Sequence, residues 1–224
     1  DADGHADVNM RIFNPDGTEA EACGNGTRCV ADHIMDNLIG SKVTIETKAG
    51  VLAATRGSNG LVQVDMGKVT RDWKLIPLAR ACDTLSVPVS VGPLNNPVCL
   101  NIGNPHAVFF VKDVDKINLK ELGPQLEHHE MFPERANIEI VSIISKNRIR
   151  LRVWERGAGI TLACGSGACV AVVGAYLKQF VERNVIVELD GGILEIDFLK
   201  KGNVLMTGPS AISFSGIIDS SLAE

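Results

Sequence analysis

One cysteine-bearing motif occurs twice in the chain. The first copy spans residues 22–31 (ACGNGTRCVA), and the second, shorter by one residue, spans 163–171 (ACGSGACVA). In each copy a cysteine, Cys23 or Cys164, stands before a Gly-x-Gly turn that leads into an apolar, helix-like segment. A thiol at a helix N-terminus is stabilised as the thiolate, because the positive end of the helix dipole favours an anion. The motif therefore predicts two reactive thiols, each in front of a helix.

Two thiols that face each other across one pocket could invert a carbon next to a carboxylate. Inversion removes a weakly acidic proton from one face and returns a proton to the other, so an acid and a base must flank the carbon. Glycines one and three residues after each cysteine leave backbone N–H groups free to hold the carboxylate as its charge grows. Because the pKa of a thiol can be brought near neutrality, this chemistry requires no cofactor. The pair indicates a racemase or an epimerase.

Further polar residues lie in predicted loops or at strand ends. Asparagines stand beside prolines or open a strand, a histidine follows Pro105, and an acid–base pair precedes Gly157. An amino-acid substrate could use an arginine for a carboxylate and a glutamate for its ammonium group. Turn formation, a loop hydrogen bond and a surface ion pair explain the same residues without a substrate. The candidates are Asn14, Asn104, His106, Asn137, Glu155 and Arg156.

The other two motif cysteines, Cys29 and Cys169, lie inside the predicted helices on an apolar background. Buried free cysteines behave as small apolar residues. We therefore expect both side chains to pack in the core rather than to react.

Composition excludes several classes of function. The 224 residues carry a net charge of −5, and the lysines and arginines are scattered rather than clustered, which disfavours nucleic-acid binding. No apolar run reaches the length of a membrane-spanning helix. Six cysteines in a chain of this length are too sparse for a secreted disulfide scaffold. Reduced thiols in the cytoplasm are expected.

The elements around the two motifs also repeat. Apolar periodicity predicts helices over 27–38 and 168–180, and each is followed by three short strands rich in β-branched residues. The first set is 43–47, 51–55 and 61–66, and the second is 185–189, 193–198 and 203–207. Another helix is predicted over 118–130, with strands over 8–13, 98–102, 107–111, 137–142 and 148–155. Prolines between 77 and 97 mark the boundary between two halves, each with sheet around a central helix.

Six strings, taken in order, closely resemble the diaminopimelate epimerase family. They are MRIFNPDG (10–17), ACGNG (22–26), GNPH (103–106), PERAN (133–137), ERG (155–157) and ACGSG (163–167). The resemblance covers essentially the whole chain. It implies an α+β fold of two pseudo-symmetric domains, each a mixed β-barrel wrapped around a central helix. The domains would span 1–70 and 71–210, with 211–224 returning to the first.

The resemblance implies the PLP-independent interconversion of LL- and meso-2,6-diaminopimelate in lysine and peptidoglycan precursor biosynthesis. It implies no cofactor and no metal, no nucleic-acid or membrane partner, and a cytoplasmic homodimer that binds diaminopimelate. Family chains also carry an N-terminal segment with a Gly-Asn-Asp-Phe motif, whose asparagine binds substrate. Residues 1–224 do not contain this motif, and without that segment the first barrel would lack strands.

The resemblance also assigns roles to the candidate residues. Cys164 would accept the proton of the LL substrate and Cys23 would donate one, with the roles exchanged in the reverse direction. The reacting carboxylate would be held by Gly24, Asn25, Gly165 and Ser166. The distal carboxylate would be held by Asn14, Asn137 and Arg156, with Asn104 and Glu155 lining the site. His106 and Glu155 would modulate the pKa values of the thiols.

Two alternatives use the same cysteines. A proline racemase or hydroxyproline epimerase also pairs two cysteines, but its monocarboxylate substrate needs no second carboxylate grip from Asn137 and Arg156. A thiol redox or metal-binding protein would use Cys23 and Cys164 differently. The chain has no Cys-x-x-Cys pair, and no histidine stands at ligand spacing beside either turn.

Overall fold

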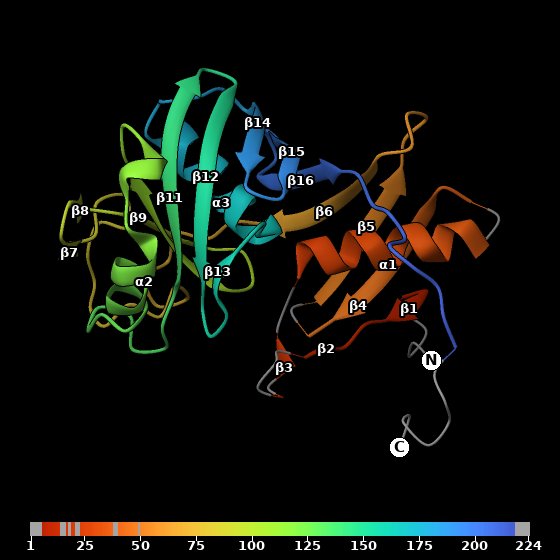
Figure 1. Cartoon of the computed structure of the whole chain (residues 1–224), viewed down its shortest axis with the longest axis horizontal. Coiled ribbons are helices and arrows are strands. Elements are labelled where there is room, and N and C mark those ends of the chain that lie inside the picture. Colours follow the sequence, from red (N-terminus) through yellow and green to blue (C-terminus); the bar gives the residue numbers. More distant parts are fainter. Residues whose placement is uncertain are drawn as a thin grey trace.

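The computed structural model describes residues 6–13, 17, 19–20, 23–37, 40–48 and 50–217. Most of its strands form one mixed sheet (Figure 1). In chain order these are β1 (Val8–Asn9), β4 (Lys42–Thr47), β5 (Gly50–Arg56), β6 (Val62–Lys68), β9 (Val98–Asn101), β10 (Pro105–Phe110), β11 (Asn137–Ser145), β12 (Arg148–Glu155), β13 (Gly159–Thr161), β14 (Asn184–Leu189), β15 (Gly192–Phe198) and β16 (Asn203–Gly208). The helices are α1 (Gly24–Asn37), α2 (Leu119–Glu127) and α3 (Gly165–Leu177). The predicted mixed α and β class is confirmed.

The order of strands across the sheet reflects the duplication. It runs β1-β4-β5-β6-β16-β15-β14-β12-β11-β10-β9, with β13 beside β12. After α1 the chain forms the antiparallel strands β4, β5 and β6, and after α3 it forms β14, β15 and β16 in the same way. The first strand of each set also pairs in parallel with an earlier strand, β1 with β4 and β12 with β14. The two sets meet where β6 pairs with β16, so the centre of the sheet joins two similar halves.

The two cysteine helices differ in how they are buried. The buried residues of α1 include Thr27, Ala31 and Met35 and follow helical spacing, whereas α3 is buried without interruption from Gly165 to Ala175. The apolar sequence of α3 requires that position, because a helix that is hydrophobic all round must be enclosed. Both helices start three residues earlier than predicted. The predicted end of the first, Leu38, lies outside the described residues.

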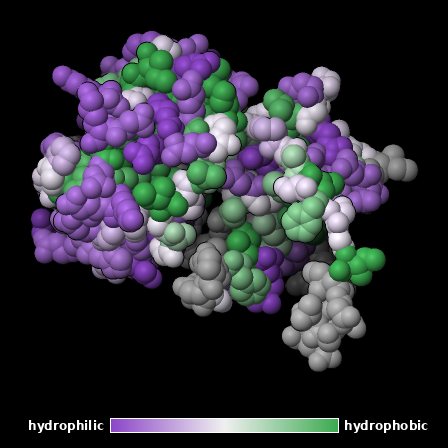
Figure 2. Space-filling model, viewed as in Figure 1, coloured by the Kyte–Doolittle hydropathy of each residue, from purple (hydrophilic) through white to green (hydrophobic). Residues whose placement is uncertain are grey.

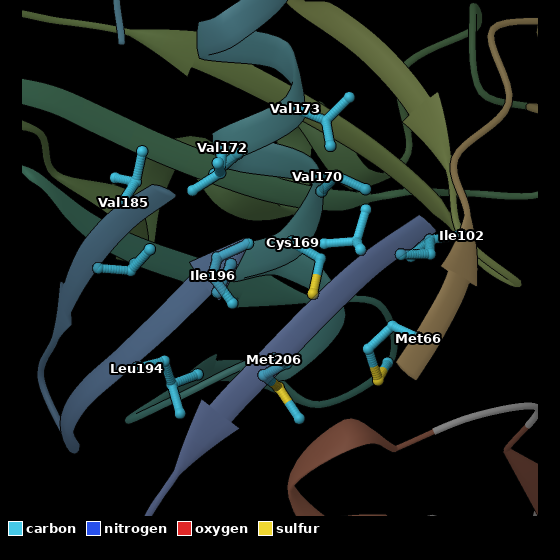
Figure 3. Close-up of a cluster of buried hydrophobic side chains, with 14 of the residues drawn as sticks. Met66, Ile102, Cys169, Val170, Val172, Val173, Val185, Leu194, Ile196 and Met206 are labelled. Atoms are coloured by element: carbon cyan, nitrogen blue, oxygen red, sulfur yellow. The ribbon is translucent and has the colours of Figure 1, made fainter. Parts of the chain in front are cut away.

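The core is formed by two clusters. The larger contains residues of α1 and α3 and the strands that follow each helix, and Figure 3 shows Met66 of β6 and Met206 of β16 beneath the start of α3. The second cluster contains Ile76, Val87 and Leu94 from the proline-bearing stretch, packed with Phe109 and Ile140. The stretch predicted as a boundary thus forms part of the second cluster. The division into domains 1–70 and 71–210 stays a prediction.

The chain after β16 lies beside α1. Arg28 Nε donates a hydrogen bond of 2.8 Å to the Pro209 carbonyl, and the Ser210 hydroxyl donates to the Asp32 carboxylate. In the view of Figure 2, the left half of the molecule has a largely hydrophilic surface. A hollow separates this half from the right half. Among the described helices, none is both long and apolar enough to cross a membrane.

In the described part of the chain, two short hairpins lie outside the large sheet, and a 3-10 helix spans Val114–Lys116. The hairpins are β2 (Ile12–Phe13) with β3 (Glu19–Ala20), and β7 (Ser90–Val91) with β8 (Leu94–Asn95). The first hairpin precedes the first cysteine turn along the chain (Figure 1).

Candidate active site

Each motif cysteine caps the helix that follows it. The Gly26 N–H donates to Cys23 Sγ at 3.3 Å, and the Gly167 N–H donates to Cys164 Sγ at 3.4 Å. The carbonyl of each cysteine accepts the first intrahelical bond, from Thr27 in one copy and from Ala168 in the other. Both sulfurs therefore lie at the positive end of a helix, as the motif predicts.

The two helix starts are in contact. A Cβ placed on Gly165 would lie 3.3 Å from Gly24 Cα, 3.3 Å from Asn25 N and 2.8 Å from Met206 Sδ. A Cβ on Gly24 would lie 3.1 Å from the terminal methyl carbons of Met66 and Met206. A side chain at position 165 would therefore press on the backbone of the first turn, whereas one at position 24 would meet the flexible ends of two methionine side chains.

A hydrogen bond of 3.2 Å connects the two turns. Asn25 Nδ2 donates it to the carbonyl of Ala163, the residue before Cys164. Asn25 Oδ1 faces the other way and accepts from Arg28 Nη1 at 3.1 Å. Asn25, the second residue of the first turn, thus holds the first turn against the second.

A chain of polar side chains leads away from Cys164. Its Sγ lies 3.5 Å from Ser166 Oγ, and Asn104 Nδ2 donates to that hydroxyl at 3.4 Å. Asn104 Oδ1 lies 2.9 Å from His106 Nε2. These contacts bring together four predicted residues from two separate motifs: Cys164, Ser166, Asn104 and His106.

The row of polar side chains that begins at Cys164 ends at Glu139, a residue that the sequence analysis did not identify. Its Oε1 lies 2.6 Å from His106 Nδ1, and both side chains have no exposed surface. Among the described residues, no hydrogen-bond partner reaches Glu139 Oε2. The same residue backs the second turn, because a Cβ on Gly167 would lie 2.9 Å from Glu139 Oε1. The sequence did contain a sign of Glu139, because a charged residue stands between Ile138 and Ile140 in an otherwise apolar strand.

The hydrogen-bond directions fix where the protons lie. Because the Asn104 amide nitrogen donates to Ser166, the Asn104 oxygen must accept, and His106 therefore carries a proton on Nε2. A second proton lies between His106 Nδ1 and Glu139 Oε1, whichever atom holds it. Burial raises the pKa of Glu139, and His106 opposes that effect.

Burial governs the pKa of Cys164 more strongly than its place at a helix start does. Burial, and then the charges of Glu155 and Glu139, raise its pKa well above the ordinary value of 9.0. Hydrogen bonds from Ser166 and the Gly167 N–H act in the opposite direction but are smaller. The side chain is 5% exposed, so its desolvation acts against the effect of the helix dipole.

Asn137 is predicted to hold a distal carboxylate together with Arg156. In this structure its amide is buried and bonded to the backbone, with Nδ2 donating to the Pro105 carbonyl at 3.0 Å and Oδ1 accepting from the Arg156 N–H at 2.9 Å. Asn137 thus holds Arg156 next to the Pro105–His106 segment. Arg156 Nη1 also donates to the Glu134 carbonyl at 3.3 Å, and the Thr161 hydroxyl donates to Glu155.

A second buried carboxylate that the sequence analysis missed supports this region. Glu127 is 3% exposed, and its Oε1 accepts from the Gly157 N–H at 3.0 Å, next to Arg156. Its Oε2 accepts from Trp154 Nε1 at 2.7 Å. Glu127 therefore fixes the turn that follows Arg156.

Two sequence predictions require correction. Cys169 is buried, but Cys29 is exposed on α1 rather than packed in the core. Counted from the capping cysteine, Cys169 is the fifth residue and Cys29 is the sixth, and one step turns a helix by about 100°. The residue equivalent to Cys169 is therefore Arg28. In addition, His106 belongs to strand β10, paired with Asn137 of β11, and not to the predicted loop.

Asn14 lies outside the described residues, so its predicted role has no structural account. The remaining predicted residues fall into two groups: one at the paired cysteine turns and their polar chain, and one around Asn137, Glu155 and Arg156. In the described part of the chain, no cluster of three or more histidine, cysteine, aspartate or glutamate residues is arranged to hold a metal ion.

Comparison with known proteins gives consistent matches over the chain. A family model described as diaminopimelate epimerase matches residues 1–71 and 98–212. A diaminopimelate epimerase from Rhodospirillum centenum is 51% identical over 217 residues, which cover 97% of this chain and 75% of the relative. One from Acidiphilium cryptum is 49% identical over 213 residues, covering 95% and 77%.

Solved structures share the fold at low identity. A hydroxyproline epimerase from Agrobacterium vitis superposes with a TM-score of 0.67 at 14% identity, covering 92% of this chain and 69% of that one. A phenazine biosynthesis protein of the PhzF family from Bacillus anthracis gives 0.62 at 21% identity, covering 92% and 78%. At these identities the likeness shows a common fold alone.

Proposed function

The chain belongs to the diaminopimelate epimerase family, and on that premise we propose that it interconverts LL- and meso-2,6-diaminopimelate by proton transfer between two cysteines. The observation that carries the proposal is the pair of capping thiols, Cys23 and Cys164, on two helices whose first residues touch. Two equivalent thiols at one junction are what inversion of a carbon requires.

Inversion would proceed with one thiolate and one thiol. The thiolate removes the α-proton, the other thiol gives its proton to the opposite face, and the two sulfurs end with exchanged protonation. For the LL substrate the family resemblance assigns Cys164 as acceptor and Cys23 as donor. Before the substrate reacts, Cys164 would release its proton to solvent, and the Ser166 hydroxyl and the Gly167 N–H would stabilise the thiolate that forms.

The substrate carboxylate next to the reacting carbon would be held between the two turns. Gly24 and Asn25 would contribute from the first helix start, and Gly165 and Ser166 from the second. Backbone N–H groups at both helix ends favour negative charge, which grows on this carboxylate as the proton leaves. The chemistry uses acid, base and anion-holding groups that the chain itself supplies, so we propose that it runs without pyridoxal phosphate.

The distal carboxylate would be held by Arg156, with Asn137 and Asn14. The Asn137 side chain supports this role indirectly, because it fixes the Arg156 backbone. Asn104 and Glu155 would line the site, and His106 with Glu155 would modulate the thiols, since the Glu155 charge raises the pKa of Cys164. A substrate with two carboxylates and two amino groups would need grips at both ends.

The test is an assay in heavy water under reducing conditions, with LL-diaminopimelate and proline as separate substrates. We expect the meso isomer to form with solvent deuterium at the inverted carbon, and proline to remain unchanged. Inversion of proline, or no exchange with diaminopimelate, would contradict the proposal.

The cellular setting completes the proposal. The enzyme would serve lysine and peptidoglycan precursor biosynthesis in the cytoplasm and would act as a homodimer. Sedimentation at assay concentrations tests the dimer, and localisation of a tagged chain tests the compartment.

A further inference from the structure

The extra residue in the first copy of the motif coincides with a buried arginine. Arg28 is 8% exposed and occupies the helix position that the second copy gives to Cys169, which has no exposed surface. Its guanidinium fits closely, because a Cβ on Gly208 would lie 3.3 Å from Arg28 Cζ. Burial lowers the pKa of Arg28, and the thiols of Cys29 and Cys23 oppose that effect.

A buried arginine is a costly way to fill a core position that a cysteine fills in the other copy. Burying a charge costs several kcal/mol unless hydrogen bonds compensate. Within the described residues no carboxylate forms an ion pair with Arg28, and its polar partners are neutral. Packing alone therefore gives no reason for an arginine at this position.

The hydrogen bonds of Arg28 show what it holds. Nε donates to the Pro209 carbonyl at 2.8 Å, on the chain that leaves β16. Nη1 donates to Asn25 Oδ1 at 3.1 Å, which leaves Asn25 Nδ2 to donate to the Ala163 carbonyl at 3.2 Å. One rigid guanidinium thus connects the C-terminal segment, the first cysteine turn and, through Asn25, the second cysteine turn.

We propose that Arg28 is a positioning residue that orients Asn25 and thereby holds the two cysteine turns in register for proton transfer across the substrate. It acts through Asn25 and touches neither Cys164 nor Ala163. The geometry of the guanidinium, with donors in two directions, is what the position requires, so a lysine of the same charge would not replace it. This inference rests on the proposed function for its effect on catalysis.

The first experiment reads the structure without any substrate. Hydrogen–deuterium exchange followed by mass spectrometry would compare wild type with Arg28→Met, Arg28→Lys and Arg56→Met. Arg56 is the matched control because it bonds to Asp32 and Asp36 of the same helix, away from the cysteine turns. We expect amides of residues 163–168 to exchange about tenfold faster in both Arg28 variants, from the loss of a charged hydrogen bond, and to be unchanged in Arg56→Met.

The second experiment tests the coupling in catalysis. In Arg28→Lys and Arg28→Met, kcat/KM should fall at least about tenfold. Adding Asn25→Ala should lower it little further, because both changes break one connection and the Asn25 backbone N–H that would face the carboxylate is kept. Wild-type exchange at residues 163–168 in both Arg28 variants, full activity of Arg28→Lys, or multiplicative effects in the double variant would overturn the inference. A wild type without epimerase activity would contradict the proposed function instead, and the exchange experiment would still decide the role of Arg28.

Discussion

His106 Nδ1 lies 2.6 Å from Glu139 Oε1, with both side chains fully enclosed, and this pair ends the polar chain that begins at the Cys164 sulfur. The pair holds a proton in the interior and keeps the Asn104 amide in one orientation. Removing one member would leave the other without its partner. The His106–Glu139 pair therefore affects both the stability of the fold and the surroundings of the Cys164 thiol.

Glu139→Ala should lower the free energy of unfolding by about 3 kcal/mol, because it leaves a buried imidazole unpaired beside a cavity. Glu139→Gln keeps the shape and one hydrogen bond, so its cost should be about 1 kcal/mol. Urea unfolding measures both values. Equal stability of the alanine variant and the wild type would show that the pair contributes nothing.

The same Glu139→Gln variant should change the pH profile of epimerisation. The Glu139 charge raises the pKa of Cys164, so its removal lowers that pKa and moves the corresponding limb of kcat/KM to lower pH. The profile is measured in both reaction directions. Glu188→Gln, on β14 and paired with Arg148, is the control and should leave the limb in place. An unchanged pH profile in Glu139→Gln would exclude an electrostatic effect of Glu139 on the Cys164 thiol.

Cys23→Ser and Cys164→Ser should each reduce kcat by about 10² to 10⁴, the usual contribution of general acid–base catalysis, because a hydroxyl is a far weaker acid than a thiol. Their free energies of unfolding should stay within about 1 kcal/mol of wild type, since the size of the side chain hardly changes. Cys29→Ser removes an exposed thiol of the same motif and should keep full activity. Turnover at the wild-type rate in either catalytic variant would refute the two-thiol scheme.

Gly165→Ala should separate the two turns. The added methyl group would lie 2.8 Å from Met206 Sδ and 3.3 Å from the Gly24 backbone, so something must shift. We expect a loss of about 1 to 3 kcal/mol in stability and about tenfold in kcat, because the added methyl group must push the neighbouring atoms aside and catalysis depends on the placement of the two thiols. Gly40→Ala, where no atom of the described residues beyond the chain neighbours lies within 4 Å of the added group, should change neither. Similar kinetics for the two variants would contradict the close contact of the turns.

The free energy of unfolding at high pH should depend on the buried thiol of Cys164. The native state keeps the Cys164 proton at pH values where an unfolded thiol, with an ordinary pKa of 9.0, has lost it. Unfolding then releases a proton, so the free energy of unfolding should fall as the pH rises above about 9, by up to about 1.4 kcal/mol per pH unit. Cys164→Ser should remove this contribution and show a shallower decline in urea unfolding between about pH 9 and 10.5. Parallel declines would mean that the thiol is not desolvated.

Local features of the fold could be predicted from the sequence. Strand lengths after each helix, the glycine turns and the two cysteine caps depend on residues close together in the chain, and their periodicity indicated them within a few residues. The repeat also indicated that two similar sets of elements would occur. The pairing of β6 with β16, which joins the sets, could not be predicted because nothing local selects one edge of a meander over another.

Burial and pairing across distant segments were decided by the tertiary structure. In the sequence, Glu139 is one charge in an apolar strand, and only the fold brings His106 of β10 beside it. Asn137 is the first residue of a predicted strand, and only the fold shows that Pro105 and Arg156 occupy its amide. Cys29 and Cys169 match in sequence, yet one extra residue turns Cys29 to solvent and places Arg28 in the core.

The sequence by itself therefore determined which residues could do chemistry and which helices would present them, because caps and periodicity are properties of neighbouring residues. Only the tertiary structure decided their environment. The pKa of Cys164 rises because burial removes water from the sulfur. Burial depends on distant segments such as the first cysteine turn, whose Asn25 bonds to a residue 138 positions away in the second turn. Desolvation is a property of the assembled structure, and no local pattern encodes it.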